Sequence, residues 1–169
     1  DKYGRWSGFT FRGQEGFSCS IVTVYQPNYS DPTNHYQSAY AQQRSMFLSE
    51  GRKIIDSRKN FQHDLLQFLQ PLCNESSGVI LCGDFNTNLR CPANRFSHAL
   101  MALGFLDIHE HKHPSLHPTH TWQGGNDQID YILVTPNLLP HVQSVGMESF
   151  YDHILSDHRS LFLDIDLGE

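Results

Sequence analysis

The chain has 169 residues, of which 38% are hydrophobic and 12% aromatic, and these values indicate a globular protein rather than a disordered one. Its net charge is -6, so it lacks the overall basic character that is typical of nucleic-acid-binding proteins. No run of apolar residues is long enough to cross a bilayer, and we expect no contact with a membrane.

The compartment is inferred from the N-terminus and the cysteines. The chain begins at Asp1, and no charged-then-apolar leader follows, so we see no signal peptide and expect a piece of a longer protein. None of the cysteines forms a Cys-x-x-Cys pair, and Cys19 and Cys82 lie in apolar runs. We therefore expect a reducing intracellular compartment, nuclear or cytoplasmic.

The first elements form a predicted hairpin followed by a helix. Residues Phe9 to Arg12 and Ser18 to Tyr25 favour strands, and the Gly13-Gln14-Glu15-Gly16 turn lies between them. The second of these strands is apolar on both faces, as in a sheet that is covered from two sides. Residues Tyr36 to Ser57 favour a helix that Gly51 interrupts.

Helical and strand patterns then alternate. Apolar residues recur at helical spacing from Phe61 to Leu72, and this predicts a helix that ends near Pro71. Val79 to Cys82 is a short buried strand, and Phe96 to Leu103 is a helix that Gly104 closes.

The last third contains a polar loop and two strands. His109 to His120 is rich in histidine and proline and predicts a loop, after which Trp122 begins or precedes a strand. Ile129 to Val134 is a clear strand, and apolar residues alternate with others from Leu161 to Leu167, so the last strand has one apolar face. The alternation of strands and helices predicts α/β layers in a single domain over residues 1–169.

The segment Leu81 to Asn86 carries the strongest chemical signal. A buried strand ends at Gly83, and Asp84 and Asn86 follow with one residue between them, which points both side chains the same way in an extended chain. An acid and an amide at the end of a strand can bind a metal or orient a water molecule. The alternative is an Asx turn that only caps the strand.

A second signal precedes the last strand. Asp157 can provide an oxygen ligand for Mg²⁺, and His158 can contact a phosphoryl oxygen or move a proton. Asp152-His153 has the same composition, but no strand fixes the end of its loop. Asp130 lies among strand hydrophobes and needs a partner. That partner is either His158, whose imidazole it would orient, or an arginine.

Tyr25 ends a strand just before Gln26-Pro27, where a tyrosine is either part of the core or a phosphate ligand. Four segments in this order are similar to the C-terminal half of the DNase I-like endonuclease/exonuclease/phosphatase superfamily: Tyr25-x-Pro27, Gly83-Asp84-x-Asn86, Thr121-Trp122 with the x-Ile129-Asp130-Tyr131-Ile132 strand, and Ser156-Asp157-His158. The resemblance implies an α/β (α+β) fold. We expect a partial four-layer α/β/β/α sandwich whose N-terminal part is missing.

The resemblance also implies Mg²⁺-dependent hydrolysis of phosphoesters, with Mn²⁺ as an alternative ion. The implied catalytic residues are Asp84, Asn86, His158, Asp130 and Tyr25. The implied metal ligands are Asp157, Asp84 and Asn86, and the implied substrate-binding residues are Arg44 and Trp122. Such a site places positive charge where negative charge develops during the reaction.

The chain departs from the family pattern at the metal site. Members of the family supply an Asn and a Glu from their N-terminal half, and neither Glu15 in the hairpin turn nor Glu50 in a helix is a convincing substitute. We therefore expect weak metal binding and weak activity for this chain by itself, and an exposed sheet edge.

The flanking segments Gly4 to Trp6, Tyr40 to Arg44 and Phe61 to Leu69 are similar to retroelement endonuclease domains. This similarity implies a reverse transcriptase domain in the same full-length polypeptide.

Three functions are compatible with these patterns: a nuclease, a phosphatase or phosphodiesterase for small molecules or lipids, and a non-catalytic remnant. A separate hypothesis is a zinc site formed by the histidines between His109 and His120, although no cysteine or acid completes a tetrahedral spacing there.

Overall fold

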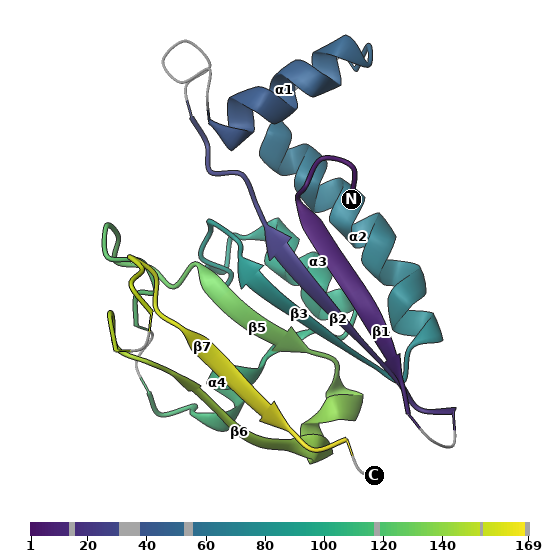
Figure 1. The fold of residues 1–169 in the computed structure, drawn as a ribbon, viewed down its shortest axis with the longest axis vertical. Coiled ribbons are helices and arrows are strands. Elements are labelled where there is room, and N and C mark those ends of the chain that lie inside the picture. The colour runs from purple at the N-terminus through teal and green to yellow at the C-terminus, as the bar shows by residue number, and fades with distance from the viewer. Residues whose placement is uncertain (14–15, 31–37, 53–55, 117–118, 153, 168–169) are drawn as a thin grey trace.

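The computed structural model describes residues 1–13, 16–30, 38–52, 56–116, 119–152 and 154–167 (Figure 1). Its main sheet has five strands in the order β1-β2-β3-β5-β4, and a second sheet pairs β6 with β7. The strands are β1 Trp6–Arg12, β2 Ser18–Tyr25, β3 Gly78–Asp84, β4 Leu106–Asp107, β5 Asp130–Val134, β6 Val142–Met147 and β7 Leu161–Ile165. The helices are α1 Ala39–Ser49, α2 Ser57–Glu75, α3 Arg95–Ala102, α4 Ile108–Lys112 and the 3-10 helix η2 Pro136–His141.

The topology of the main sheet brings three strand ends together. Strand β2 runs parallel to β3, and the crossover between them contains α1 and α2, whereas β5 runs antiparallel to β3. The last residues of β2 and β3 therefore lie at the same edge of the sheet as the first residue of β5. The register places Tyr25 beside Asp84, and Asp84 beside Asp130.

One face of the main sheet packs against α2 and α3. Phe61, Leu65 and Leu69 of α2 are fully buried there, because they recur at helical spacing and form one apolar stripe. They contact inward-facing residues of β2, β3 and β5, and Phe96 and Leu100 of α3 complete the cluster. This core fixes the position of β3 and β5, whose ends carry the polar residues described below.

The opposite face packs against the two-stranded sheet. Ile80, Ile132 and Val134 of the main sheet form a second cluster with Val142 and Val145 of β6. The alternation predicted for the last strand is confirmed: Leu161, Leu163 and Ile165 are half-buried against this cluster, while Phe162 and Asp164 are exposed.

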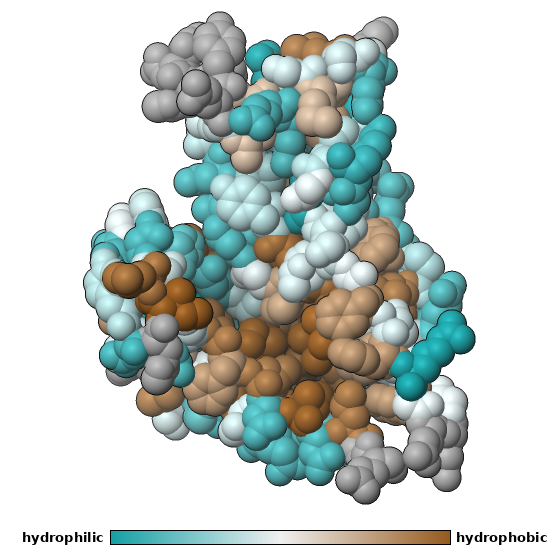
Figure 2. All heavy atoms as spheres, in the orientation of Figure 1, coloured by the Kyte–Doolittle hydropathy of each residue, from teal (hydrophilic) through white to brown (hydrophobic). Residues whose placement is uncertain are grey.

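The second sheet does not cover all of this face. Figure 2 shows an apolar surface that extends over the main sheet beside β7. Phe9 and Phe11 on the outer strand β1 are 55% and 52% exposed, and their register places them beside Ile21 and Cys19 of β2. The chain therefore leaves part of an apolar sheet face open to solvent, next to β1, which is an edge strand.

The helix boundaries follow side-chain caps. Ser38 caps α1, Asp56 caps α2 and Asn94 caps α3, each through an oxygen that accepts hydrogen bonds from the first-turn backbone. Gly51 and Gly104, both with positive φ, follow the ends of α1 and α3, as the sequence predicted.

The predicted end of α2 at Pro71 was wrong. The helix continues to Glu75, because a proline near the end of a helix removes only one backbone hydrogen bond while Leu72 and Cys73 still pack against the core. The helix expected over Tyr36 to Ser57 is two helices within the described residues, with α1 ending at Ser49 and α2 beginning at Ser57.

The predicted hairpin is confirmed, with Trp6 opposite Val24 and Arg12 opposite Ser18, although Gln14 and Glu15 of its turn lie outside the described residues. The mixed α/β class is confirmed as well. The outer helical layer of a four-layer sandwich stays a prediction. Among the described residues, no helix combines the length and the apolar character that crossing a membrane would require.

Candidate active site

Asp84 is the last residue of β3, and the backbone before it is one that only glycine tolerates. Gly83 has a φ of +136°, and a Cβ at this position would collide with the carbonyl oxygen of Val24 on the neighbouring strand. The close approach of β2 and β3 at this point sets Asp84 between Tyr25 and Asp130. Gly83 is therefore part of the site's architecture.

Asn86 is locked against Asp84. Its backbone N–H donates to Asp84 Oδ1 at 2.7 Å, and its side-chain Nδ2 donates to Asp84 Oδ2 at 3.0 Å and to the carbonyl of Gln26 at 2.8 Å. This is an Asx-type turn. The turn that caps the strand and the arrangement that could bind a metal or a water molecule are therefore the same geometry. These bonds use both Nδ2 hydrogens, and the phenol of Tyr25 is a further hydrogen-bond partner of the Asn86 side chain.

Asp130 begins β5 and is oriented by Thr121. The buried Thr121 Oγ1 accepts the backbone N–H of Ile129 at 2.9 Å and that of Asp130 at 3.0 Å. The carbonyl of Thr121 also accepts the N–H of Arg159 at 2.8 Å, which ties the His158 loop to the same point. The sequence predicted no role for Thr121, although this residue lies directly before Trp122.

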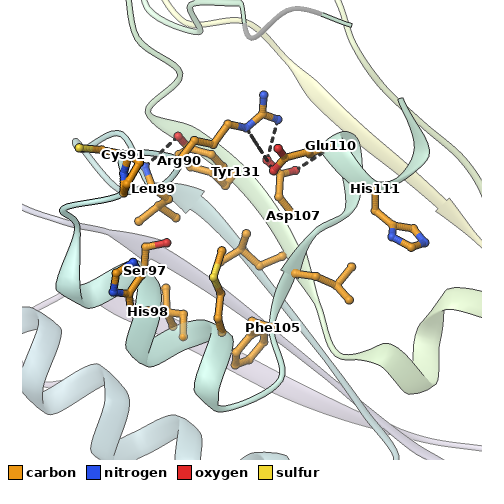
Figure 3. Close-up of a pocket in the computed structure, with 15 residues that line it drawn as sticks. Leu89, Arg90, Cys91, Ser97, His98, Phe105, Asp107, Glu110, His111 and Tyr131 are labelled. Atoms are coloured by element: carbon orange, nitrogen blue, oxygen red, sulfur yellow. Dashed lines mark hydrogen bonds and ion pairs between the residues drawn. The ribbon is translucent and has the colours of Figure 1, made fainter. Parts of the chain in front are cut away.

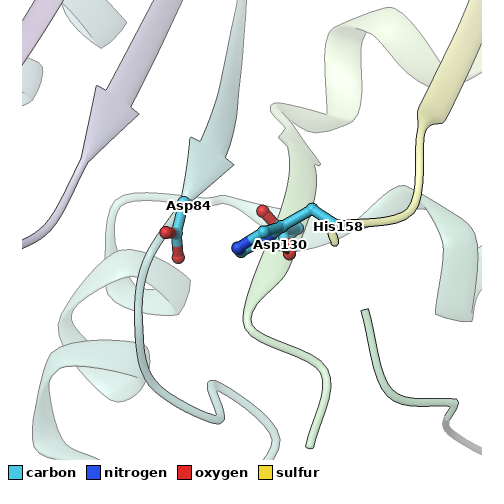
Figure 4. A group of neighbouring side chains, drawn as sticks. All are labelled: Asp84, Asp130 and His158. Carbon is cyan, nitrogen blue, oxygen red and sulfur yellow. Dashed lines mark hydrogen bonds and ion pairs between the residues drawn. The ribbon is translucent and has the colours of Figure 1, made fainter. Parts of the chain in front are cut away.

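His158 faces Asp130 across the sheet edge (Figure 4). Its Nδ1 lies 2.9 Å from Asp130 Oδ2, so of the two partners considered for Asp130, the structure has the histidine. One ligand atom from each of Asp84, Asp130 and His158 lies within 4.8 Å of the other two. Two strand ends and the segment before β7, far apart in the sequence, thus form one cluster of ionisable groups.

The cluster perturbs the titration of its members. Burial raises the pKa of Asp84 to about 6, and the charge of Asp130 raises it further, against the opposing hydrogen bonds of Asn86 and the charge of His158. For His158 burial lowers the pKa, but its hydrogen bond with Asp130 and the charges of three nearby carboxylates outweigh this, so its pKa is raised above the ordinary value. Asp84 is therefore largely ionised near neutral pH, and the surroundings of His158 favour its protonated ring.

Tyr25 lies at the exposed rim of the cluster. Its side chain is 43% exposed, so it is not a core tyrosine. Burial of part of the phenol and the negative charge of Asp84 raise its pKa, against the hydrogen bond with Asn86. The phenol therefore stays protonated at neutral pH and can donate a hydrogen bond.

Asp157 and Trp122 form a separate pair beside the cluster. Trp122 Nε1 donates to Asp157 Oδ2 at 3.0 Å, and this bond lowers the pKa of Asp157. Within the described residues, the group that could hold a metal contains Asp84, Asp130 and His158 but not Asp157. The role of Asp157 as a metal ligand is thus a prediction that this geometry does not favour.

Arg44 was the expected cation, but among the described residues no hydrogen bond or ion pair joins it to the cluster. Arg58 at the start of α2 contacts the site instead, because its Nη2 donates to the backbone carbonyl of Asn86 at 2.9 Å. Sequence reasoning missed Arg58, because only the crossover brings the start of α2 to the end of β3. Glu50 does not replace the family's glutamate here, since it bonds to Lys2 at 2.7 Å and to Tyr3.

A pocket lies on the other face of β5 (Figure 3). It has a volume of about 380 Å³ and lies between α3, β4 and α4, with Tyr131 and Leu133 of β5 in its lining. Its cation, Arg90, already bonds to Asp107 at 2.8 Å. Because side chains alternate along a strand, this pocket and Asp130 are on opposite sides of the sheet.

The histidine-rich segment contains a short helix rather than only a loop, which corrects the expectation for His109 to His120. The rings of His109 and His113 lie 5.1 Å apart, and His113 Nε2 lies 3.0 Å from the carbonyl of Val145. His117 is outside the described residues. Within those residues, Asp84, Asp130 and His158 form the one candidate metal group, so nothing described here supports the zinc hypothesis.

The residues of the cluster fit a divalent cation. Two carboxylates outweigh one imidazole whether or not the ring is protonated, so the cluster would repel a phosphate group unless another positive charge is present. Burial raises the pKa of Asp84, and a cation beside its carboxylate would oppose this shift. Carboxylate oxygens are also ligands that Mg²⁺ prefers, and Asn86 Oδ1 adds a neutral oxygen nearby.

Three solved structures share the fold of this chain. AP endonuclease LMAP from Leishmania major has a TM-score of 0.69 at 16% identity, over 96% of this chain and 55% of that one. The Xenopus laevis APE2 catalytic domain has a TM-score of 0.64 at 19% identity, over 95% of this chain and 55% of that one. The 3′ phosphatase NExo from Neisseria, solved bound to a product DNA hairpin, has a TM-score of 0.61 at 15% identity, over 98% and 81%.

The chain thus spans about half the length of the first two of these structures. No curated protein matches it by sequence. The model of the Endonuclease/Exonuclease/phosphatase family matches residues 5–158, which is most of the chain. The chain therefore belongs to the endonuclease/exonuclease/phosphatase family and has its DNase I-like fold.

Proposed function

We propose that the chain carries the hydrolytic centre of a divalent-cation-dependent phosphodiesterase that acts on nucleic acid. The observation that supports this most strongly is the convergence of Asp84, Asp130 and His158 within 4.8 Å at one sheet edge. The family supports the reaction class, and the fold shared with enzymes described as AP endonucleases supports the substrate class.

Asp84 accepts a proton from the attacking water in this proposal. With its pKa raised to about 6, it is ionised at neutral pH and is still a stronger base than an ordinary aspartate. Asn86 holds Asp84 through two hydrogen bonds and accepts one from the water through Oδ1.

His158 stabilises the charge that develops on the phosphoryl oxygens. Asp130 holds the Nδ1–H, so the Nε2–H is the one that would face the substrate, and the raised pKa of His158 favours the protonated ring. Tyr25 donates its phenolic hydrogen to another phosphate oxygen from the exposed rim. Arg58 adds positive charge behind Asn86.

Mg²⁺, or Mn²⁺ in its place, would be held by Asp84 and Asp130 with Asn86 Oδ1, and would supply positive charge for the phosphate that these residues lack. Few protein oxygens converge there, and Mg²⁺ prefers six ligands in a tight octahedron. We therefore propose that this chain binds the ion weakly and is a weak enzyme on its own.

Cleavage of a fluorescent oligonucleotide tests the proposal. With millimolar Mg²⁺, the chain should cleave it, and cleavage should stop with a chelator and in Asp84→Ala and His158→Ala. The matched controls are Asp152→Ala and His98→Ala, which alter an exposed aspartate and an exposed histidine outside the cluster. Cleavage that persists in both active-site variants would refute the assignment of the site.

The same purified chain can distinguish two alternative functions. A phosphatase or phosphodiesterase for small molecules or lipids is favoured by the net charge of −6, and it would hydrolyse such substrates while sparing oligonucleotides. A non-catalytic remnant would cleave neither. The reverse transcriptase domain is a further proposal that rests only on the similarity of the flanking segments to retroelement endonucleases.

A further inference from the structure

Trp122 lies next to His158 and is partly exposed. The N–H of Gln123 donates to the carbonyl of Asp157 at 2.9 Å, and the N–H of Arg159 donates to that of Thr121 at 2.8 Å. These two bonds flank an antiparallel pair of Trp122 and His158, the closer kind of pair, in which Cα atoms are about 4.5 Å apart. The indole, 36% exposed, therefore belongs to the immediate rim of the site.

The indole is held in one orientation. Its Nε1 donates to Asp157 Oδ2 at 3.0 Å, so the polar atom of the ring already has a partner. The backbone of Gly124 and Gly125 lies against the ring: a Cβ at Gly124 would collide with it, and one at Gly125 would lie 3.1 Å from it. Two glycines and a carboxylate thus support a large aromatic surface that remains open to solvent.

This arrangement has the properties of a stacking platform. A ring that is already fixed loses little conformational entropy when a flat ligand packs on it. Stacking on an aromatic side chain needs no positive charge, which matters in a chain with a net charge of −6. Asp157, which accepts the hydrogen bond of the indole, lies outside the group formed by Asp84, Asp130 and His158.

We propose that Trp122 stacks against a nucleobase adjacent to the phosphate held at His158, with Asp157, Gly124 and Gly125 as positioning residues for the indole. This proposal rests on the proposed function and specifies its substrate. The substrate carries a flat base beside its phosphodiester, so it is a nucleic acid strand with unpaired bases rather than a lipid or sugar phosphate.

The test compares two single-stranded probes that differ only in their bases. One is a hexamer of deoxyadenosine, and the other is a hexamer of abasic tetrahydrofuran units, both with phosphorothioate linkages that slow hydrolysis and a fluorescent label for anisotropy. We expect the base-bearing probe to bind about 5- to 150-fold more tightly, the usual effect of stacking one base. It should also quench tryptophan fluorescence, because Trp122 is the exposed one of two tryptophans and Trp6 is in the core.

Variants at position 122 assign the effect. Trp122→Leu should bind both probes alike, Trp122→Phe should keep part of the preference, and both should fold, as judged by circular dichroism. Should Trp122→Leu unfold, the Phe variant carries the test, because a smaller ring must reduce the preference. Equal binding of the two probes by the unmodified chain, or an undiminished preference in the variants, would overturn the proposal.

Failure of this inference is distinguishable from failure of the proposed function. With ordinary phosphodiester linkages, Mg²⁺-dependent cleavage of the abasic hexamer reports on Asp84 and His158 without any base. Cleavage of both hexamers with no preference for bases would leave the hydrolytic function standing and overturn the stacking platform. A strong preference for bases without cleavage would support the platform and refute the hydrolytic function.

Discussion

Replacing Asp130 by asparagine should lower the pKa of His158. The side chain keeps its shape, but the carboxylate that faces Nδ1 at 2.9 Å loses its charge. Asp130 is the source of both the hydrogen bond and the largest charge effect that raise the pKa of His158 against burial. Without it, the ring should lose its proton nearer to, or below, its ordinary pKa.

The magnitude follows from the geometry. Two unit charges 2.9 Å apart attract each other by about 1.4 kcal/mol in water and by about 3 kcal/mol at an effective dielectric constant of about 40. We use this range because both side chains are partly exposed. One pKa unit corresponds to about 1.36 kcal/mol, so the pKa of His158 should fall by about one to two.

The assay is a titration of the histidine ring protons by NMR. The chain has 11 histidines, so a His158→Gln spectrum is needed to assign the resonance. At neutral pH, Asp130→Asn should hold His158 neutral and lose most of its phosphodiesterase activity, with partial recovery at lower pH. An unchanged or higher pKa of His158 in Asp130→Asn would refute the reasoning, because the carboxylate would then not be what keeps the ring charged.

Three further changes test the parts of the site separately. Asp84→Asn should change how stability depends on pH. Because the pKa of Asp84 is raised from 3.8 to about 6 in the folded chain, the free energy of unfolding of the unmodified chain should fall by roughly 2 to 3 kcal/mol as the pH rises from 3.8 to 6. Chemical denaturation at several pH values should show this fall in the unmodified chain and not in Asp84→Asn. Thr121→Val removes the acceptor of two backbone N–H groups and should lower kcat at least tenfold, whereas Thr121→Ser should restore it, as steady-state kinetics can determine. Gly83→Ala should destabilise the chain by more than about 2 kcal/mol and abolish cleavage, because its φ of +136° and the contact with Val24 exclude a side chain; a thermal midpoint like that of the unmodified chain would contradict this.

Local patterns in the sequence predicted much of the main sheet and its helical face. The continuous apolar run of β3 and the helical spacing of Phe61, Leu65 and Leu69 both reflect burial. Buried positions carry apolar residues, so their spacing can be recognised in the sequence. The alternation along β7 was equally readable. These elements have one apolar face or are apolar throughout.

The missed elements lack such a pattern. Strand β6 has a register irregularity between Val142 and Ser144, which places its buried residues Val142 and Val145 three positions apart and breaks the alternation of a strand. Strand β4 has two residues and α4 has five, which is too short for any periodicity. Their existence depends on pairing with β5 and packing on β6, not on local sequence.

The candidate site could be predicted in part, because the sequence motifs contain the residues that lie together in the structure: Asp84, Asn86, Asp130 and His158. What the sequence could not show was the shared hydrogen-bond acceptor at Thr121, the contact of Arg58 with Asn86, or the bond between Asp157 and the indole of Trp122. Each depends on segments that only the folded sheet brings together. The roles of all these residues are proposals that the experiments above address.

The central claim is that Asp84, Asp130 and His158 form one cation-dependent hydrolytic centre. Binding of Mn²⁺, followed by electron paramagnetic resonance, tests it most directly. The account predicts one weakly bound ion per chain, lost in Asp84→Ala and Asp130→Ala and retained in Asp152→Ala. Binding of Mn²⁺ that is the same in all four proteins would contradict it.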